Sequence, residues 1–137
     1  MKKRRKKFPP GSPQEWLDHA ISDLALARLG LEANEVLPEQ VCFHAQQAVE
    51  KALKAVLFHK GIKFPLIHDI EELIEIAQKG GFLLPNWAEE MAVLTPYAVE
   101  TRYPGHWEDL HETEVNEALN VAERTVEWAK TMLSRKK

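Results

Sequence analysis

One segment of the chain places an arginine, two aromatic side chains and a histidine beside a Pro-Gly pair that must end a helix. It reads Glu100-Thr101-Arg102-Tyr103-Pro104-Gly105-His106-Trp107. The planar guanidinium of Arg102 suits a phosphate, His106 can exchange protons near neutral pH, and Tyr103 or Trp107 can stack on a base. The alternative is an ordinary turn in which the aromatic rings pack underneath and Arg102 pairs with a carboxylate. The residue types therefore indicate either phosphate chemistry or a plain helix stop.

A second set of polar residues is expected to share one face of a helix over residues 38–60. At 100° per residue the set lies within about 80° of arc. This polar ridge consists of His44, Gln47, Lys51, Lys54 and Phe58. An imidazole, an amide and two ammonium groups on an otherwise acidic molecule are what a phosphate-bearing ligand requires. The alternative is a solvent-facing edge in which Glu50 pairs with Lys54, four residues later.

A third pair, His68-Asp69, stands at the start of another expected helix. Asp69 is typical of a helix N-cap, and His68 either orients the loop through a backbone carbonyl or joins a ligand site. The six histidines are scattered, with no HExxH motif or paired His/Cys spacing, so the sequence predicts no metal and no cofactor. A glycine-rich phosphate loop and a Cys/His nucleophile signature are also lacking, and we expect Cys42 to lie in the core.

Five amphipathic helices are expected to position these residues, over about residues 12–31, 38–60, 69–79, 86–98 and 112–134. Ser12-Pro13-Gln14-Glu15 is a capping-box start, and Pro38 and Gly61 bracket the second helix. Pro96 should kink the fourth helix or end its regular part. The apolar stripe of the first helix consists of Leu17, Ala20, Ile21, Leu24, Ala27 and Leu31.

No stretch alternates with period two for long enough to form a strand. The predicted fold class is therefore all-α, an up-and-down antiparallel bundle of about five helices, with the alanine-rich second helix at its centre.

Charge and cysteine content narrow the class of protein further. The net charge is −3, but six of the eighteen basic residues lie in Lys2–Lys7, so residues 8–137, with twelve basic and 21 acidic residues, carry −9. An acidic body of this kind does not lay a broad positive face along a duplex. We expect a disordered basic arm over residues 1–11 and one bundle domain over 12–137. A single cysteine and the lack of a long apolar run predict a cytoplasmic protein without a membrane span.

Three segments together resemble the HEPN family. They are residues 42–55, Cys-Phe-His-Ala-Gln-Gln-Ala-Val-Glu-Lys-Ala-Leu-Lys-Ala, residues 68–73, His-Asp-Ile-Glu-Glu-Leu, and Arg102-Tyr103-Pro104. The resemblance covers about residues 16–133 and is most specific in Gln-Gln-Ala-x-Glu-Lys-x-Leu-Lys. It implies a homodimeric helical bundle with a groove near the dimer interface. It also implies a module that binds a nucleotide or RNA, often beside a small nucleotidyltransferase subunit in a toxin–antitoxin-like operon.

Some HEPN proteins are metal-independent ribonucleases, in which a histidine follows an arginine after roughly four to six residues. Here three residues separate Arg102 from His106 and eight separate Arg102 from His111. This departure favours a non-catalytic binding module over a ribonuclease that uses Arg102 and His106. A purely structural dimeric interaction subunit is the third alternative. The ligand-binding residues of the favoured module are predicted to be His44, Gln47, Lys51, Lys54, His68, Asp69, Arg102 and Tyr103.

Overall fold

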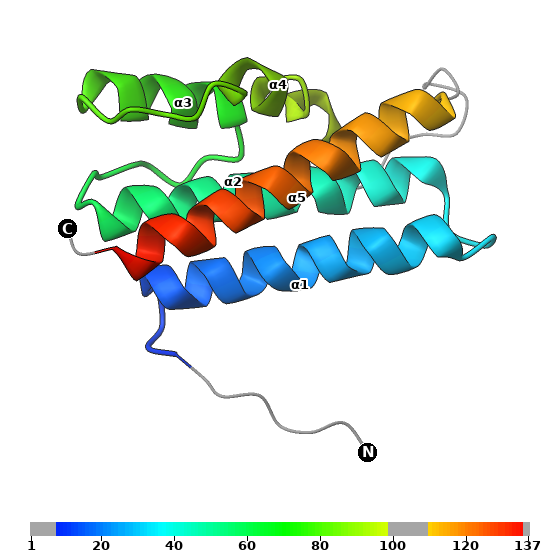
Figure 1. Ribbon diagram of the computed structural model, residues 1–137, viewed down its shortest axis with the longest axis horizontal. Helices are drawn as coiled ribbons and strands as arrows, with labels where there is room; N and C mark the ends of the chain where they lie inside the picture. Colours follow the sequence, from blue (N-terminus) through cyan, green and yellow to red (C-terminus); the bar gives the residue numbers. More distant parts are fainter. Residues whose placement is uncertain (1–7, 99–109, 136–137) are drawn as a thin grey trace.

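The computed structural model of the chain describes residues 8–98 and 110–135, and within these ranges all regular structure is helical (Figure 1). The elements are α1 (Pro13–Glu32), α2 (Pro38–His59), α3 (Ile70–Lys79), α4 (Ala88–Ala92), the 3-10 helix η1 (Thr95–Ala98) and α5 (Glu112–Ser134). The predicted all-α class and bundle of about five helices are confirmed.

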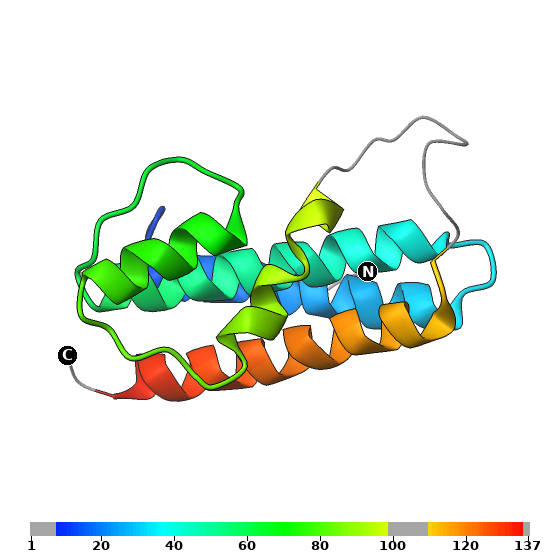
Figure 2. The ribbon, with the colours of Figure 1, turned by 90° about the horizontal axis from the view of Figure 1, so that it is seen from above.

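Three long helices, α1, α2 and α5, pack side by side, and α3 and α4 cover them along one edge (Figures 1 and 2). α1 and α2 run antiparallel. α5 runs in the same direction as α2, since the segment that holds α3 and α4 returns the chain along the bundle. α2 contacts α1, α3, η1 and α5, which makes it the central helix, as its alanine content predicts.

The core is built around small side chains on α2. Ala45, Ala48, Ala52 and Ala55 are all fully buried, and the lack of bulk lets neighbouring helices approach closely. Larger apolar side chains fill the space between helices, including Leu53, Leu57, Ile70, Leu73, Met91 and Val126. Cys42 is also fully buried, as predicted. The position of α2 therefore means that any polar residue on it must face a neighbouring helix, a loop or a narrow strip of surface.

The helix ends follow from local residue chemistry. At the start of α1 the Ser12 hydroxyl accepts a hydrogen bond from the Glu15 backbone N–H at 3.2 Å, while the Glu15 carboxylate accepts from the Gly11 N–H at 2.7 Å. The predicted capping box is thus shifted by one residue on its carboxylate side. Gly61, just after α2, has a φ of 76°, a left-handed conformation that glycine adopts without steric cost.

One expected detail of the helices is confirmed and one is wrong. The fourth helix is divided into α4 and η1, as expected from Pro96. Pro96 explains the division, because its ring clashes with the carbonyl four residues earlier, which belongs to Ala92, the last residue of α4. Leu31 does not complete the apolar stripe of α1 and is 40% exposed. Gly30 is the buried residue there, packed so closely that an added Cβ would lie 3.1 Å from Val36 Cγ1.

None of the helices in the described ranges has the length and apolar content that crossing a membrane demands. Within residues 8–98 and 110–135, His, Cys, Asp and Glu side chains do not gather in threes as a metal site would require.

Candidate functional site

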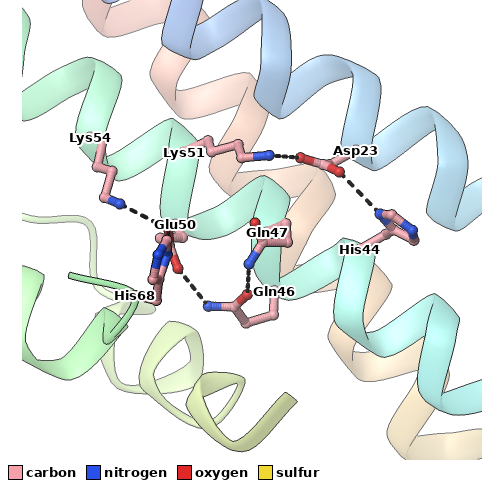
Figure 3. A network of polar contacts seen from close by, with 8 residues as sticks. All are labelled: Asp23, His44, Gln46, Gln47, Glu50, Lys51, Lys54 and His68. Atoms are coloured by element: carbon pink, nitrogen blue, oxygen red, sulfur yellow. Dashed lines mark hydrogen bonds and ion pairs between the residues drawn. The ribbon is translucent and has the colours of Figure 1, made fainter. Parts of the chain in front are cut away.

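The predicted site residues divide into two groups. Arg102, Tyr103 and His106 lie outside the described residues. The other six, His44, Gln47, Lys51, Lys54, His68 and Asp69, lie on α2 or at the start of α3. The described part of the site is therefore centred on α2, and its geometry separates into two polar clusters (Figure 3).

The first cluster, here called the Asp23 cluster, joins α1 to α2 through one carboxylate. Lys51 Nζ donates to Asp23 Oδ2 at 2.6 Å, and His44 Nδ1 lies 3.0 Å from Asp23 Oδ1. Because an ionised carboxylate only accepts hydrogen bonds, the proton must reside on Nδ1 of His44, so a neutral imidazole presents Nε2 as an acceptor. The side chain of Asp23 is 11% exposed, against 29% for His44 and 22% for Lys51. The two basic groups thus remain accessible from outside while a buried anion fixes their positions.

The second cluster, here called the Glu50 cluster, lies between α2 and the loop before α3. Glu50 Oε2 accepts from Lys54 Nζ at 2.9 Å and is 3.0 Å from His68 Nδ1, while Glu50 Oε1 accepts from the Gln46 amide at 3.1 Å. The side chains of Glu50 and Lys54 are 1% and 3% exposed, whereas that of His68 is 75% exposed. Glu50 therefore ties a buried lysine and an exposed histidine to the same point of α2.

An aromatic cover explains why Lys54 is buried. The ring of Trp16 lies 5.2 Å from Lys54 Nζ, and Trp16 meets Phe64 edge to face at 6.5 Å between centroids. A cation held over an aromatic face and against a carboxylate is stabilised on both sides. Lys54 therefore does not lie on a solvent-facing edge of α2, which was the alternative interpretation of the polar ridge. Its predicted pairing with Glu50 is confirmed.

Gln47 extends the Glu50 cluster toward the surface, because its amide donates to Gln46 Oε1 at 2.7 Å (Figure 3). The single polar ridge expected on α2 is thus divided between two partners, α1 on one side and the loop before α3 on the other. Phe58, the last member of the polar ridge, is 49% exposed. The helical spacing was correct, but the neighbouring elements split the face that it predicted.

The His68-Asp69 pair combines a confirmed prediction with a correction. Asp69 caps α3, since its Oδ1 accepts the Glu72 backbone N–H at 3.4 Å, as predicted. His68 does not hold a backbone carbonyl: its Nδ1 contacts the Glu50 carboxylate. The reason is geometric, because the capped start of α3 lies beside α2 and places the imidazole within reach of a buried anion.

Sequence reasoning missed the two carboxylates that organise the clusters. Asp23 falls on the apolar stripe of α1, three residues after Ala20 and four before Ala27. A charged residue in such a stripe is almost never buried without a partner, so it signals an inter-helix pair. Local spacing pairs Glu50 only with Lys54 and does not reveal its burial or its contact with His68 in the loop before α3.

Cys42, near the start of α2, is inert. Burial, together with the negative charges of Glu114 and Glu39, raises the pKa of its thiol to about 12. A thiol is nucleophilic and metal-binding only as the thiolate. Cys42 therefore contributes packing and no chemistry near neutral pH.

Comparison with known proteins gives the family of this fold and motif set. A family model described as "HEPN domain" matches residues 13–132. The chain belongs to the HEPN family. A protein of Methanocaldococcus jannaschii named "Putative toxin MJ1304" is 31% identical to it over 136 residues, which covers 88% of each chain.

Two crystal structures resemble this HEPN chain along nearly their whole length. TT1696 from Thermus thermophilus shares 27% identity with a TM-score of 0.70, covering 90% of this chain and 99% of that one. ST0689, described as an archaeal HEPN homologue, shares 26% identity with a TM-score of 0.67, covering 89% of this chain and 98% of its own. Both likenesses support the helical arrangement described above.

The HEPN-like segment 42–55 forms most of α2, and the structure shows which of its polar residues are buried. Gln46, Glu50 and Lys54 face inward and are buried, while Gln47 and Lys51 lie closer to the surface. The most specific piece of the resemblance therefore encodes a buried polar framework together with a partly exposed strip beside it.

Proposed function

We propose that this HEPN-family chain binds a phosphate group of a nucleotide or RNA through the Asp23 cluster, with Gln47 and His68 at its margins. The observation that carries the proposal is the shared carboxylate, which holds Lys51 at 2.6 Å and His44 at 3.0 Å on its two oxygens. An ammonium group has three donors, so Lys51 retains donors for an anion after bonding Asp23. His44, whose Nδ1 faces Asp23, donates through Nε2 to an anion only when the imidazole is protonated on both nitrogens.

The buried Glu50 cluster serves this proposal as a framework. Glu50 and Lys54 neutralise each other inside the bundle, and the Gln46–Gln47 contact connects them to the exposed strip. A binding group held by a rigid network loses less conformational entropy when a ligand arrives. In this arrangement Lys54 supports the site from beneath, and Asp69 acts by capping α3 and so positioning His68.

Arg102 and Tyr103 complete the proposed site on sequence grounds, as a phosphate fork and a stacking or supporting ring. The family assignment and the toxin name of the M. jannaschii relative support a toxin–antitoxin-like setting. Within that setting we propose a cytoplasmic homodimer with a small nucleotidyltransferase as partner subunit. We also propose that residues 1–11 form a basic arm and that residues 12–137 form one domain.

Calorimetric titration with ATP, GTP and short RNAs, with and without the partner subunit, tests the proposal. Lys51→Met should weaken binding of a phosphate-bearing ligand at least about tenfold, since a charged hydrogen bond contributes on the order of 1.5 to 3 kcal/mol. Lys130→Met is the matched control, because Lys130 is an exposed lysine on α5 that pairs only with Glu127, at 3.1 Å, among the described residues. Absence of binding in every combination, or equal losses in both variants, contradicts the proposal.

Ribonuclease activity is a second candidate, supported by the toxin name of the relative. His106 would act as general base on a ribose 2′-hydroxyl, and Arg102 would stabilise the charge that develops on phosphate. His106→Ala should then reduce RNA cleavage in EDTA by about 10² to 10⁴-fold. Intact RNA with the wild-type protein, or an unaffected variant, would exclude this candidate and leave the binding module.

A further inference from the structure

Two grooves lie on either side of α4, away from the clusters on α2. The α4–α5 groove has a volume of about 510 Å³ and a floor that includes Leu94, Ala118 and Val121. The α3–α4 groove has a volume of about 410 Å³ and is lined in part by Ile74. Val93 borders both grooves and is 68% exposed, so the two form one continuous surface that this valine divides.

The charge of this surface is strongly one-sided. Its acidic residues are Glu71, Glu75, Glu89, Glu90, Glu114 and Glu117. Among the described residues that line the two grooves, Arg124 is the sole lysine or arginine, and it is paired with Glu90 at 3.0 Å. Apolar floors with carboxylate rims suit lysine and arginine side chains, whose aliphatic stems lie on apolar surface while their charged ends reach anions.

A buried donor in the α4–α5 groove adds a second feature. Arg124 stacks 5.3 Å from the Trp87 ring, and its Nε has no hydrogen-bond acceptor among the residues that the structure describes. Leaving a buried donor without an acceptor is costly. Arg124 is thus held by Trp87 and Glu90, and the other carboxylates of the rim have no lysine or arginine partner among the described residues that line the two grooves.

We propose that this acidic double groove binds the basic N-terminal segment Lys2–Lys7 of a second copy of the chain. The segment consists of six consecutive lysines and arginines, which complement the groove carboxylates in charge and the groove floor in their aliphatic stems. Exchange of the segment between two copies, each arm lying on the other's groove, closes a dimer by a symmetric contact.

The bundle geometry favours a second copy over the chain's own arm. α1 begins at the end of the bundle where α5 finishes, and the α4–α5 groove involves α5 only up to Arg124 (Figure 1). From Ser134 to Arg124 is about 15 Å along the helix. The arm must also pass about 20 Å across two packed helices. Seven extended residues reach at most about 25 Å, so little of the segment could lie in its own groove.

Carbodiimide cross-linking of the full chain tests this proposal, because the reagent joins lysine amines to carboxylates in contact with them. An equal mixture of unlabelled and heavy-nitrogen-labelled protein distinguishes contacts between copies from contacts within one copy. We expect mixed-isotope peptides that join Lys2, Lys3, Lys6 or Lys7 to the groove glutamates. Their yield should fall steeply at about 1 M salt, where the Debye length is about 3 Å.

Matched charge reversals on α5 sharpen the test. Glu117→Lys, in the groove, should lower the mixed-isotope yield at the remaining groove carboxylates about fivefold or more, since like charges repel the arm. Glu127→Lys makes the same change at an exposed position of the same helix outside the groove and should leave the yield unchanged. Circular dichroism confirms that both variants are folded. Cross-links confined to one isotope, arm cross-links spread over carboxylates elsewhere, or equal yields in the two variants would each overturn the proposal.

Discussion

The two polar clusters on α2 use the same residue types in opposite ways. In the Glu50 cluster a lysine and its carboxylate are both almost fully buried under Trp16, while in the Asp23 cluster the carboxylate is buried and its lysine remains partly exposed. Lys51 and Lys54 are three residues apart on one helix, so the helix itself does not distinguish them. The difference comes from what packs above each: an aromatic pair over Lys54, and an edge of α1 beside Lys51.

This comparison separates a structural role from a binding role for identical side chains. A buried ion pair cannot reach a ligand without breaking, and breaking it leaves an uncompensated charge inside the protein. A partly exposed lysine on a buried carboxylate can exchange part of its contacts for a ligand while its anchor stays in place.

Removing Lys54 should have the largest effect on stability. Lys54→Met leaves Glu50 buried without its ammonium partner, and breaking one side of a buried pair costs about 3 to 5 kcal/mol. The free energy of unfolding from urea titration measures this loss. The double variant Glu50→Gln with Lys54→Met removes the stranded charge and should recover part of it. A loss below about 1 kcal/mol in the single variant would mean that the pair is solvated.

Removing Lys51 should cost less stability and more binding. Lys51→Met leaves Asp23 with His44 as a partner and some exposure, so we expect a loss of about 1 to 2 kcal/mol in the free energy of unfolding. Comparison of this value with that of Lys54→Met, under the same conditions, measures the difference between the clusters directly. Equal losses in the two variants would remove the distinction on which the binding proposal rests.

Cys42 extends the comparison to a buried group that has no charged partner. Its pKa is raised from 9.0 to about 12, so between these values the unfolded chain releases a proton that the folded chain retains. The contribution of Cys42 to the free energy of unfolding is therefore constant below pH 9. It falls by about 1.4 kcal/mol per pH unit as the pH rises toward 12. Urea titrations at pH 8 and pH 10 should show a smaller decline in Cys42→Ala than in the wild type. An equal decline in both proteins would show that other groups account for it.

The sequence predicts the local features of the helices but not the packing that distinguishes the two clusters. The bounds of α5 and the start of α2 follow from caps, prolines and spacing, which are local, and they agree with the structure. The burial of Lys54 depends on Trp16 and Phe64, which are 38 and ten residues away in sequence. The position of Asp23 opposite Lys51 depends on how α1 packs on α2. Periodicity identified the face that carries the candidate site, but only tertiary packing shows which of its cations remain accessible.

Replacement of His68, the exposed partner of Glu50, should have the smallest effect on the free energy of unfolding. It is also the most sensitive test of how Glu50 is held. His68 is 75% exposed and is the third group on Glu50, after Lys54 and Gln46. His68→Gln should change the free energy of unfolding by about 0.5 kcal/mol or less, as surface pairs usually do. If His68 also contacts a phosphate, the same variant weakens ligand binding while the folded state is barely affected. A large loss of stability would show instead that this imidazole belongs to the structural cluster, and the boundary between support and binding would then lie at Gln47.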